Sequence, residues 1–245
     1  MICKLCNEEK RLIKTHIIPE CFFRLLRADD GRSPIVVTNT DDLPHKRSPI
    51  GVYDKSLLCE ECERIFSEWD SYACELFIKQ INKFNILKDG DEIAAFTLEK
   101  FDFDKLMLFF ISLLWRASCS SHNFYERVDL GPYEDITKKN ILNKCTDYGN
   151  QISVCLSRFI SYKGLEKLTK TSHNPFKERW SGANAYRFYL GDITAYIKVD
   201  KRNWPAELEK CAVNKGDPLY VVCRKLEGSN DLNALIATVK NKNNV

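Results

Sequence analysis

The chain has 245 residues, of which 44% are hydrophobic, and a formal net charge of +3. That length supports a buried core in one large domain or two small ones, and so small a charge does not by itself indicate a nucleic-acid binder. The longest apolar run, residues 106–115, is too short to cross a bilayer and predicts a buried helix. No apolar segment typical of a secretory signal follows Met1, so we expect a cytoplasmic protein without a membrane anchor.

The first third of the chain is expected to hold two helices joined by a turn-rich segment. Pro19 precedes residues 20–27, whose apolar side chains have helical spacing. Residues 29–52 contain several turn-forming residues around one short β-like run at 35–38. A longer amphipathic helix is predicted after Cys62, and its apolar face consists of Ile65, Trp69, Ala73 and Leu76.

The middle of the chain is predicted to be helical. A buried helix is expected over residues 104–119, which include the longest apolar run. Pro132 suits the start of another helix, because proline is tolerated in a first helical turn. The apolar side of that helix is expected to comprise Ile136, Ile141 and Leu142.

Beyond the middle of the chain, the hydrophobic period changes to that of strands. Residues 185–190 and 193–199 flank Gly191-Asp192, which predicts a β-hairpin with a two-residue turn. Residues 219–226 have the composition of a further strand. Asp231 is placed to cap a last helix that carries Leu232, Leu235, Ile236 and Val239.

These elements predict an α+β fold with an N-terminal treble-clef zinc module, a helical middle and a C-terminal β region that ends in a helix. We expect the boundary between two units at residues 83 and 84, giving a zinc module over 1–83 and a second region over 84–245. The second region is the candidate for recognition of a target or partner.

Eleven cysteines in a chain expected to be cytoplasmic favour thiols and metal over disulfides. Two C-x-x-C pairs, Cys3 with Cys6 and Cys59 with Cys62, supply the four thiolates that a structural zinc ion prefers. A redox-active pair is the alternative, but the strand–helix–strand context of a thioredoxin-like site is missing. We expect the other seven to be small apolar residues of the core: Cys21, Cys74, Cys119, Cys145, Cys155, Cys211 and Cys223.

One segment between the cysteine pairs suggests a family. The run Thr15-His16-Ile17-Ile18-Pro19 lies between the pairs, and Leu57-Leu58-Cys59-x-x-Cys62-Glu63 forms the second. Over about residues 1–75 the chain resembles the zinc-stapled HNH endonucleases of bacterial and phage genomes. The resemblance implies that His16 is the general base for phosphodiester hydrolysis and that a second ion, Mg²⁺ or Mn²⁺, binds nearby.

The sequence departs from the family pattern at the expected ligands of the second ion. Thr15 stands where the family usually has an acid or histidine, and Glu63 where a histidine is common. We expect Glu63, Asp70 and Asp54 to supply the missing ligands, because Asp70 follows Glu63 by about two helical turns and shares its face. Asn39 is the only asparagine between His16 and Cys59 that could match the middle residue of the family motif.

Two functions remain open from the sequence. The first is a metal-dependent HNH endonuclease that cleaves DNA in restriction or anti-phage defence. The alternative is a non-catalytic treble-clef module with a degenerate site, which binds nucleic acid or a protein partner. Residues 138–187 hold ten Lys and Arg against three Asp and Glu, so this basic segment could follow phosphates. The sequence gives no indication of the oligomeric state.

Overall fold

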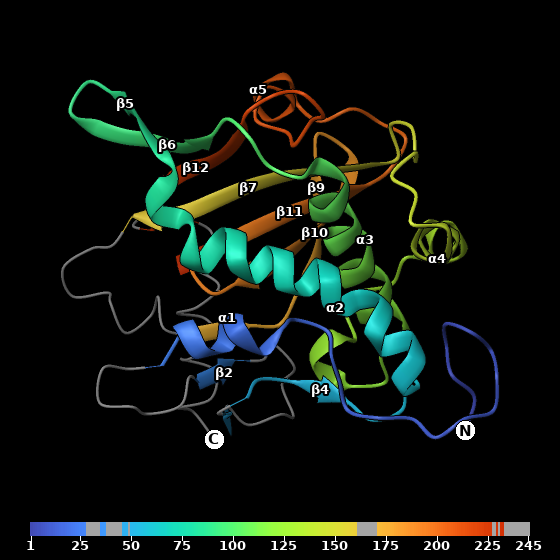
Figure 1. Ribbon diagram of the computed structural model, residues 1–245. Coiled ribbons are helices and arrows are strands. Elements are labelled where there is room, and N and C mark those ends of the chain that lie inside the picture. The colour runs from blue at the N-terminus through green and yellow to red at the C-terminus, as the bar shows by residue number, and fades with distance from the viewer. Residues whose placement is uncertain are drawn as a thin grey trace.

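A seven-stranded sheet and the helices packed on it form the larger part of the structure, a computed structural model that describes residues 1–27, 35–37, 46–48, 50–160, 171–226, 229 and 231–232 (Figure 1). Neighbouring strands are antiparallel except β12 and β7, which are parallel. In spatial order the strands are β5 (Asn85–Asp89), β6 (Glu92–Leu98), β12 (Leu219–Lys225), β7 (Ile152–Ile160), β11 (Ile193–Val199), β10 (Ala183–Leu190) and β9 (Phe176–Trp180). The α+β class predicted from the sequence is therefore confirmed.

The predicted C-terminal hairpin is present as β10 and β11, in which Leu190 pairs with Ile193 across the two-residue turn. Gly191 has φ +67° at this turn, a backbone conformation that glycine adopts without strain. The strand predicted near residue 219 is β12. No strand was predicted at β5, β6, β7 or β9; every residue of β5 is exposed, so that strand lacks an apolar face.

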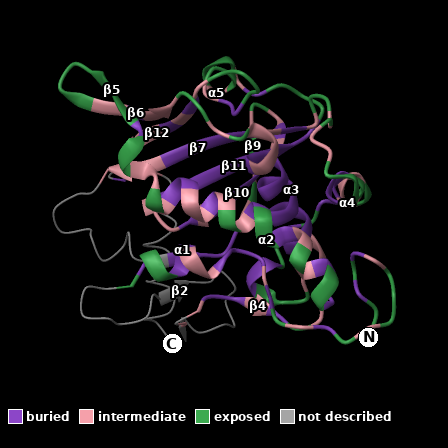
Figure 2. Cartoon of the chain, viewed as in Figure 1, coloured by how far each residue is buried: buried purple, intermediate pink, exposed green. Residues whose placement is uncertain are grey.

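Within the described ranges, the α-helices beside these strands are α1 (Glu20–Leu25), α2 (Glu60–Cys74), α3 (Phe103–Cys119), α4 (Tyr133–Asn143) and α5 (Ala206–Glu209). The predicted buried helix is α3, which is buried from Leu106 to Ala117 and packs against α2, α4 and β7 (Figure 2). The expected apolar side of α4 is wrong at Leu142, whose side chain is 51% exposed, whereas its neighbour Ile141 is fully buried.

Near the N-terminus, two short strands form a ribbon that precedes α2. Strand β1 (Thr15–His16) pairs antiparallel with β4 (Tyr53–Asp54), and α2 begins shortly after β4. A separate three-stranded sheet has the order β3 (Lys46–Arg47), β2 (Ile35–Val37) and β8 (Thr171–His173).

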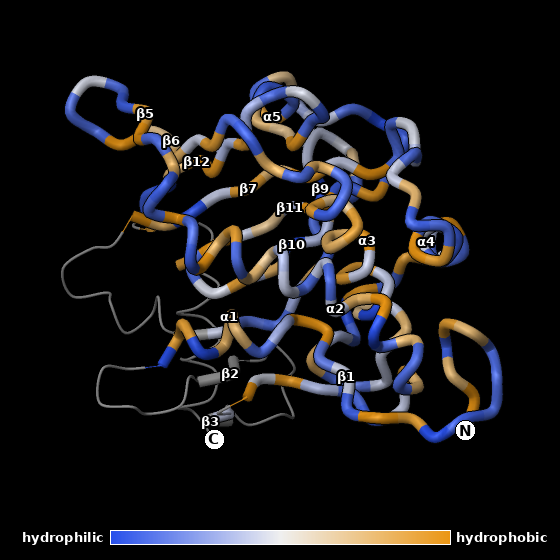
Figure 3. Tube along the Cα trace, viewed as in Figure 1, coloured by the Kyte–Doolittle hydropathy of each residue, from blue (hydrophilic) through white to orange (hydrophobic). Residues whose placement is uncertain are grey.

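One hydrophobic cluster runs from the cysteine-rich N-terminus through α2 and α3 to the sheet, and apolar segments along α3 and the strands follow the same path (Figure 3). This core crosses the expected boundary at residues 83 and 84, which stays a prediction. Among the described residues, no helix has the length and apolarity needed to span a membrane. Beyond Leu232, the expected last helix lies outside the described residues.

The expectation that all seven scattered cysteines are reduced is wrong for two of them. Cys21 in α1 and Cys74 at the end of α2 form a disulfide whose Cα atoms are 6.3 Å apart. Residues 53 positions apart are brought together here because α1 packs beside the C-terminal end of α2, a proximity that neither local sequence predicts. The other nine cysteines are free thiols.

Candidate metal centre and active site

The two C-x-x-C pairs converge into one cluster. The Sγ atoms of Cys3, Cys6, Cys59 and Cys62 all lie within 4.8 Å of one another. Tetrahedral zinc with Zn–S bonds of about 2.3 Å separates its sulfur ligands by roughly 3.8 Å, so the cluster has the size of a four-thiolate site. These four cysteines can therefore hold a metal ion such as zinc.

Backbone contacts hold the two pairs together. The Lys4 N–H donates to the Leu57 carbonyl at 3.0 Å, and the Ile13 N–H donates to the Leu58 carbonyl at 2.9 Å. The Cys59 N–H donates to the Cys3 sulfur at 3.4 Å, as expected of an amide that supports a thiolate ligand. The N-terminal turn is thus fixed against the residues that lead into α2.

The surroundings of Cys3 and Cys62 shift the pKa values of these two thiols in opposite directions. Burial raises the pKa of Cys3, but backbone N–H donors from Cys6, Cys59 and Leu5 outweigh burial and lower the pKa to about 7. Burial and the neighbouring sulfurs raise the pKa of Cys62. Four neighbouring thiols lose their protons together only when a cation neutralises the resulting thiolate charges. The chemistry of the cluster therefore fits a divalent metal ion.

His16 on β1 is held in place by a hydrogen bond to its backbone and by the burial of the residues next to it in the chain. Its carbonyl accepts a 2.8 Å hydrogen bond from Nη1 of Arg116, and the following residues Ile17 and Ile18 are buried. The imidazole ring makes an edge contact with the ring of Tyr53, with the centroids 5.9 Å apart. Burial lowers the pKa of His16 below its ordinary 6.5, and the charge of Glu20 opposes part of that shift. The ring is therefore neutral at pH 7.

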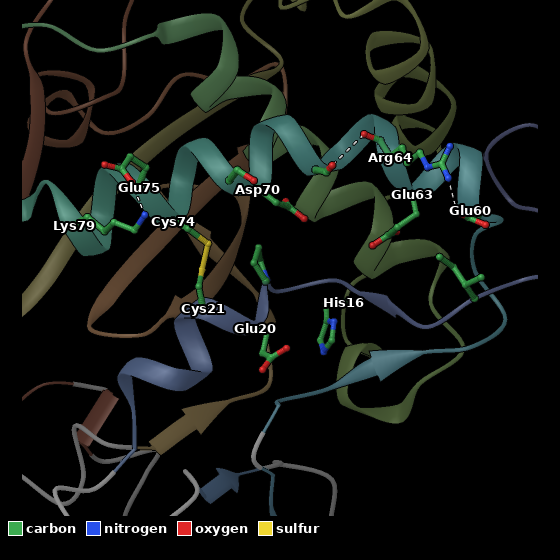
Figure 4. A pocket seen from close by; sticks show the side chains of 14 residues that line it. His16, Glu20, Cys21, Glu60, Glu63, Arg64, Asp70, Cys74, Glu75 and Lys79 are labelled. Atoms are coloured by element: carbon green, nitrogen blue, oxygen red, sulfur yellow. Dashed lines mark hydrogen bonds and ion pairs between the residues drawn. A yellow bond between two sulfur atoms is a disulfide. The ribbon is translucent and has the colours of Figure 1, made fainter. Parts of the chain in front are cut away.

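A cavity of about 630 Å³ lies between α2 on one side and β1 and α1 on the other (Figure 4). Glu63 and Asp70 project from α2, whereas His16 and Glu20 border the cavity from the opposite side. Its complete lining is Ile13, His16, Pro19, Glu20, Cys21, Glu60, Glu63, Arg64, Ser67, Asp70, Ser71, Cys74, Glu75 and Lys79. The structure therefore places three of the four predicted catalytic residues at one cavity, and that cavity is rich in acids.

Three polar atoms at this cavity and its wall lack partners. Within the described ranges, Thr15 Oγ1, His16 Nε2 and Glu63 Oε2 are buried and accept or donate no hydrogen bond. Burial raises the pKa of Glu63, and the charge of Arg116 opposes part of that shift. Because an orphaned buried polar atom costs about 1–3 kcal/mol, such a group is expected where a ligand, water or ion completes the site.

Asp70 is committed to an ion pair. The guanidinium of Arg116 donates from Nη1 and Nη2 to the two carboxylate oxygens of Asp70 at 2.8 and 2.7 Å. Arg116 itself is completely buried in α3 and also donates to Ser112. Burial raises the pKa of the Asp70 carboxyl and the Arg116 charge opposes that shift. Asp70 therefore anchors the wall of the cavity with both oxygens occupied.

Asp54 lies outside the cavity lining, and its carboxylate is also occupied. Oδ1 accepts hydrogen bonds from the N–H and hydroxyl of Ser56, and Oδ2 accepts from Ser120 and Ser121. Burial raises the pKa of Asp54, but these donors outweigh it and lower the pKa to about 2. The structure thus places Asp54 as the tie between β4 and the residues that follow α3, apart from His16 and Glu63.

Sequence reasoning missed Glu20 and Arg116. Glu20 directly follows the His-Ile-Ile-Pro run and exerts the largest charge effect on His16. Its position after Pro19, at the first turn of a helix, resembled an ordinary helix-start acid. Arg116 ends the longest apolar run of the chain, and a charge in that place signals a buried partner. The sequence could not identify Asp70, 46 residues away, as that partner.

The β1–β4 ribbon carries a basic and aromatic face beside His16. Thr15 pairs with Asp54 and His16 with Tyr53, so side chains two residues apart lie on the same face. Lys14 and Lys55, both exposed, therefore share a face with His16 and Tyr53. The Lys14 Nζ lies 4.6 Å from the centroid of the Tyr53 ring and the Lys55 Nζ 6.0 Å from it.

Comparison of the chain with protein-family models, with curated proteins and with solved structures finds no match. The resemblance to HNH endonucleases therefore stays an expectation from the motif residues.

Proposed function

We propose that the protein is an HNH-type endonuclease that hydrolyses phosphodiester bonds of DNA with the help of a divalent ion. The observation that carries this proposal is the presence of unpartnered His16 Nε2 and Glu63 Oε2 at one acidic cavity, beside a four-cysteine cluster. The order of β1, β4 and α2 is also the order of the ββα unit of that family.

The four-cysteine cluster serves in this proposal as a structural zinc site in a treble-clef module. Cys59 stands at the N-terminal cap of α2, and Cys62 lies in its first turn. Zinc bound there would fix the start of α2 relative to β1, since Cys3 and Cys6 precede β1 in the chain. The zinc ion would position Glu63 with respect to His16 and take no part in the reaction.

The cavity suits a second, harder cation. Mg²⁺ and Mn²⁺ bind through one or two protein groups, and water and phosphate oxygens complete their coordination. Glu63 has a free carboxylate oxygen, whereas Asp70 is paired with Arg116 and Asp54 with serines. We therefore assign Glu63 as the carboxylate ligand, with Glu20, on the opposite side of the cavity, as a further acid. Such an ion, when bound, stabilises negative charge on the phosphoryl oxygens and on the leaving group.

His16 is suited to accept the proton of the attacking water. A neutral imidazole accepts a proton at one nitrogen, and Nε2 of His16 is buried with no competing donor among the described residues. Its lowered pKa keeps that nitrogen unprotonated at neutral pH. The Arg116 bond to the His16 carbonyl holds the backbone in place while the ring acts.

The ion dependence tests this proposal. Zinc-loaded protein is incubated with supercoiled plasmid in EDTA, Mg²⁺ or Mn²⁺, and nicked circles are quantified. We expect nicking with Mg²⁺ or Mn²⁺, none in EDTA, and a loss of about 100-fold in Glu63→Gln at unchanged zinc content. Glu61→Gln is the matched control, because Glu61 is an exposed acid of the same helical turn that contacts Lys10. Absence of nicking by the wild-type protein with either ion contradicts the proposal.

A non-catalytic nucleic-acid-binding module is the second candidate function. Two observations favour it: Thr15 replaces an acidic or histidine ligand, and Asp70 is neutralised by Arg116. The ribbon face of Lys14, Tyr53 and Lys55 supplies the chemistry for binding, since lysines pair with phosphates and an aromatic ring can stack on a base. Lys138, from the basic segment, instead donates to the Lys4 carbonyl and to Asn7 and so supports the cysteine-rich turn.

The binding candidate is tested without cleavage. Fluorescein-labelled single-stranded and duplex DNA are titrated with protein in EDTA at several salt concentrations. Neutralising Lys14 and Lys55 should weaken binding and reduce the salt slope by about 2, one unit for each lost phosphate contact. Lys88→Ala, at an exposed lysine in the distant β5–β6 hairpin, is the control. An unchanged slope contradicts binding by this ribbon.

A further inference from the structure

The wall of the cavity that holds His16 and Glu63 contains the Cys21–Cys74 disulfide. Both cysteines are half-buried and both line the cavity (Figure 4). Cys21 follows Glu20 in the first turn of α1, and Cys74 is the last residue of α2, about one turn beyond Asp70. The disulfide therefore links the two walls from which the acids of the cavity project.

The other cysteines of the chain are reduced. Nine cysteines are free, and four of them form the cluster that can hold a metal ion only as thiolates. Conditions that oxidise thiols without selection would also oxidise these four ligands. A disulfide and a thiolate cluster can coexist in one chain if small thiols in solution exchange with the disulfide and leave the four clustered thiolates unchanged.

The contacts around the disulfide indicate which parts would stay in place without it. Phe22 and Phe23 are both 1% exposed, and the ring of Phe22 lies 6.2 Å from that of Phe109. These apolar contacts keep α1 docked on the core. Residues 75–79, directly after Cys74, form a π-helical turn, an irregularity that often occurs where a helix adjusts for function. Loss of the disulfide would therefore free the cavity wall locally and leave the fold intact.

We propose that the Cys21–Cys74 disulfide exchanges reversibly with a small thiol and that its reduction loosens the wall of the cavity carrying Glu20. A thiolate RS⁻ attacks one sulfur, the Cys21–Cys74 bond breaks, and the other cysteine leaves as a thiolate. A second RS⁻ attacks the R sulfur of the mixed disulfide, releases the first cysteine as a thiolate and forms RS–SR. Two small thiolates thus supply the two electrons that reduce the pair.

Control of the ion site by this exchange rests on the proposed function, whereas the exchange itself does not. With the disulfide intact, α1 holds Glu20 at a fixed distance from α2 and so from Glu63. After reduction, the two helices keep their apolar contacts but lose their covalent link. Because groups that support metal ligands change affinity by about 10-fold or more, we expect the oxidised protein to bind the divalent ion more tightly.

The exchange is measured on the zinc-loaded full chain with mixtures of reduced and oxidised glutathione. Free thiols are alkylated with one reagent, and disulfide thiols, after reduction, with an isotopic partner, so that mass spectrometry gives the state of each cysteine. We expect Cys21 and Cys74 to convert together in the folded protein, while Cys155 and the four clustered cysteines keep their state. A pair that remains oxidised until the protein unfolds, or that is never linked, overturns the proposal.

The consequence for the cavity is measured by Mn²⁺ binding, with electron paramagnetic resonance of the free ion as the readout. Reduced protein, Cys21→Ser and Cys74→Ser should each bind Mn²⁺ roughly 10-fold more weakly than the oxidised protein. Cys223→Ser is the control, since Cys223 is a half-buried thiol on β12. Equal affinity in both states overturns the coupling. Absence of Mn²⁺ binding in either state contradicts the proposed function instead and leaves the exchange result standing.

Discussion

Arg116 on α3 and Asp70 on α2 form a two-bond ion pair with N–O distances of 2.7 and 2.8 Å, and the arginine is fully buried. The same guanidinium binds the carbonyl of His16. A residue of α3, 100 positions after His16, therefore contacts both the cavity wall and the backbone of the candidate general base. The N-terminal motif is consequently not self-sufficient in this protein.

Removing one member of this pair is expected to be costly. Arg116→Met leaves the half-buried Asp70 carboxylate unpaired, so the free energy of unfolding should fall by about 3–5 kcal/mol. Chemical denaturation measures this change. Glu68→Gln serves as the comparison because Glu68 pairs with Lys105 at the surface, where the loss should stay below about 1 kcal/mol. An Arg116→Met variant as stable as Glu68→Gln would contradict the anchoring role.

The four-cysteine cluster predicts a specific loss of metal. Cys62→Ser should reduce bound zinc from about one ion per chain to well below it, because a serine hydroxyl is a poor zinc ligand. Metal analysis of the purified variants measures this. Cys155→Ser is the matched control, since Cys155 is buried in the sheet away from the cluster. Full zinc occupancy in Cys62→Ser would show that the cluster is not the binding site.

Asp54 predicts a pH-dependent contribution to stability. Its pKa is about 2 in the folded chain and about 3.9 when unfolded. A depressed folded pKa stabilises the fold fully above about pH 4, and this contribution disappears as the pH falls from about 4 to 2. Asp54→Asn should therefore be less stable than the wild type at pH 7, by about 1–2 kcal/mol, with the difference shrinking in acid.

Urea unfolding of the two proteins at pH 7, 5, 4 and 3 gives this difference directly. Glu61→Gln provides the reference for an exposed acid whose pKa is lowered chiefly by Lys10. A constant difference between wild type and Asp54→Asn across the pH range would mean that the serine hydrogen bonds do not depend on the carboxylate charge.

The departure at Thr15 makes a prediction for the ion site. Thr15 is fully buried and lies near Glu63, at the position where the resembling family has an acid or histidine. Thr15→Asp should bind Mn²⁺ about tenfold more tightly, because it adds a carboxylate ligand. It should also be less stable without the ion, since two buried carboxylates then repel each other. Thr15→Asn separates the effect of charge from that of shape, and equal Mn²⁺ affinity in all three proteins would place the ion elsewhere.

Several features that depend on residues close together in the sequence were predicted correctly. Periodicity identified α3 and the β10–β11 hairpin, and residue spacing brought Cys3, Cys6, Cys59 and Cys62 to one place. Spacing along α2 also put Glu63 and Asp70 at the same cavity. Periodicity and helical spacing are local features of the sequence. The two C-x-x-C pairs are distant in sequence, but binding of one metal ion requires all four thiolates to lie together.

Contacts between distant segments were not predictable in the same way. Asp70 pairs with a residue on α3, Asp54 with a residue just after α3, and Cys21 with the last residue of α2. Each of these contacts depends on how the helices pack. Of the candidate ligands of the second ion, two prove to be occupied by such partners. Asn39 lies outside the described residues, so its match to the middle residue of the motif stays a prediction.

The role of His16 as general base is tested most directly by the nicking rate of His16→Ala in Mn²⁺, at a zinc content equal to that of the wild type. A general base contributes about 100- to 10,000-fold, so the rate should fall by at least that lower factor, and added imidazole should restore part of it. Nicking by His16→Ala at the wild-type rate would contradict the account.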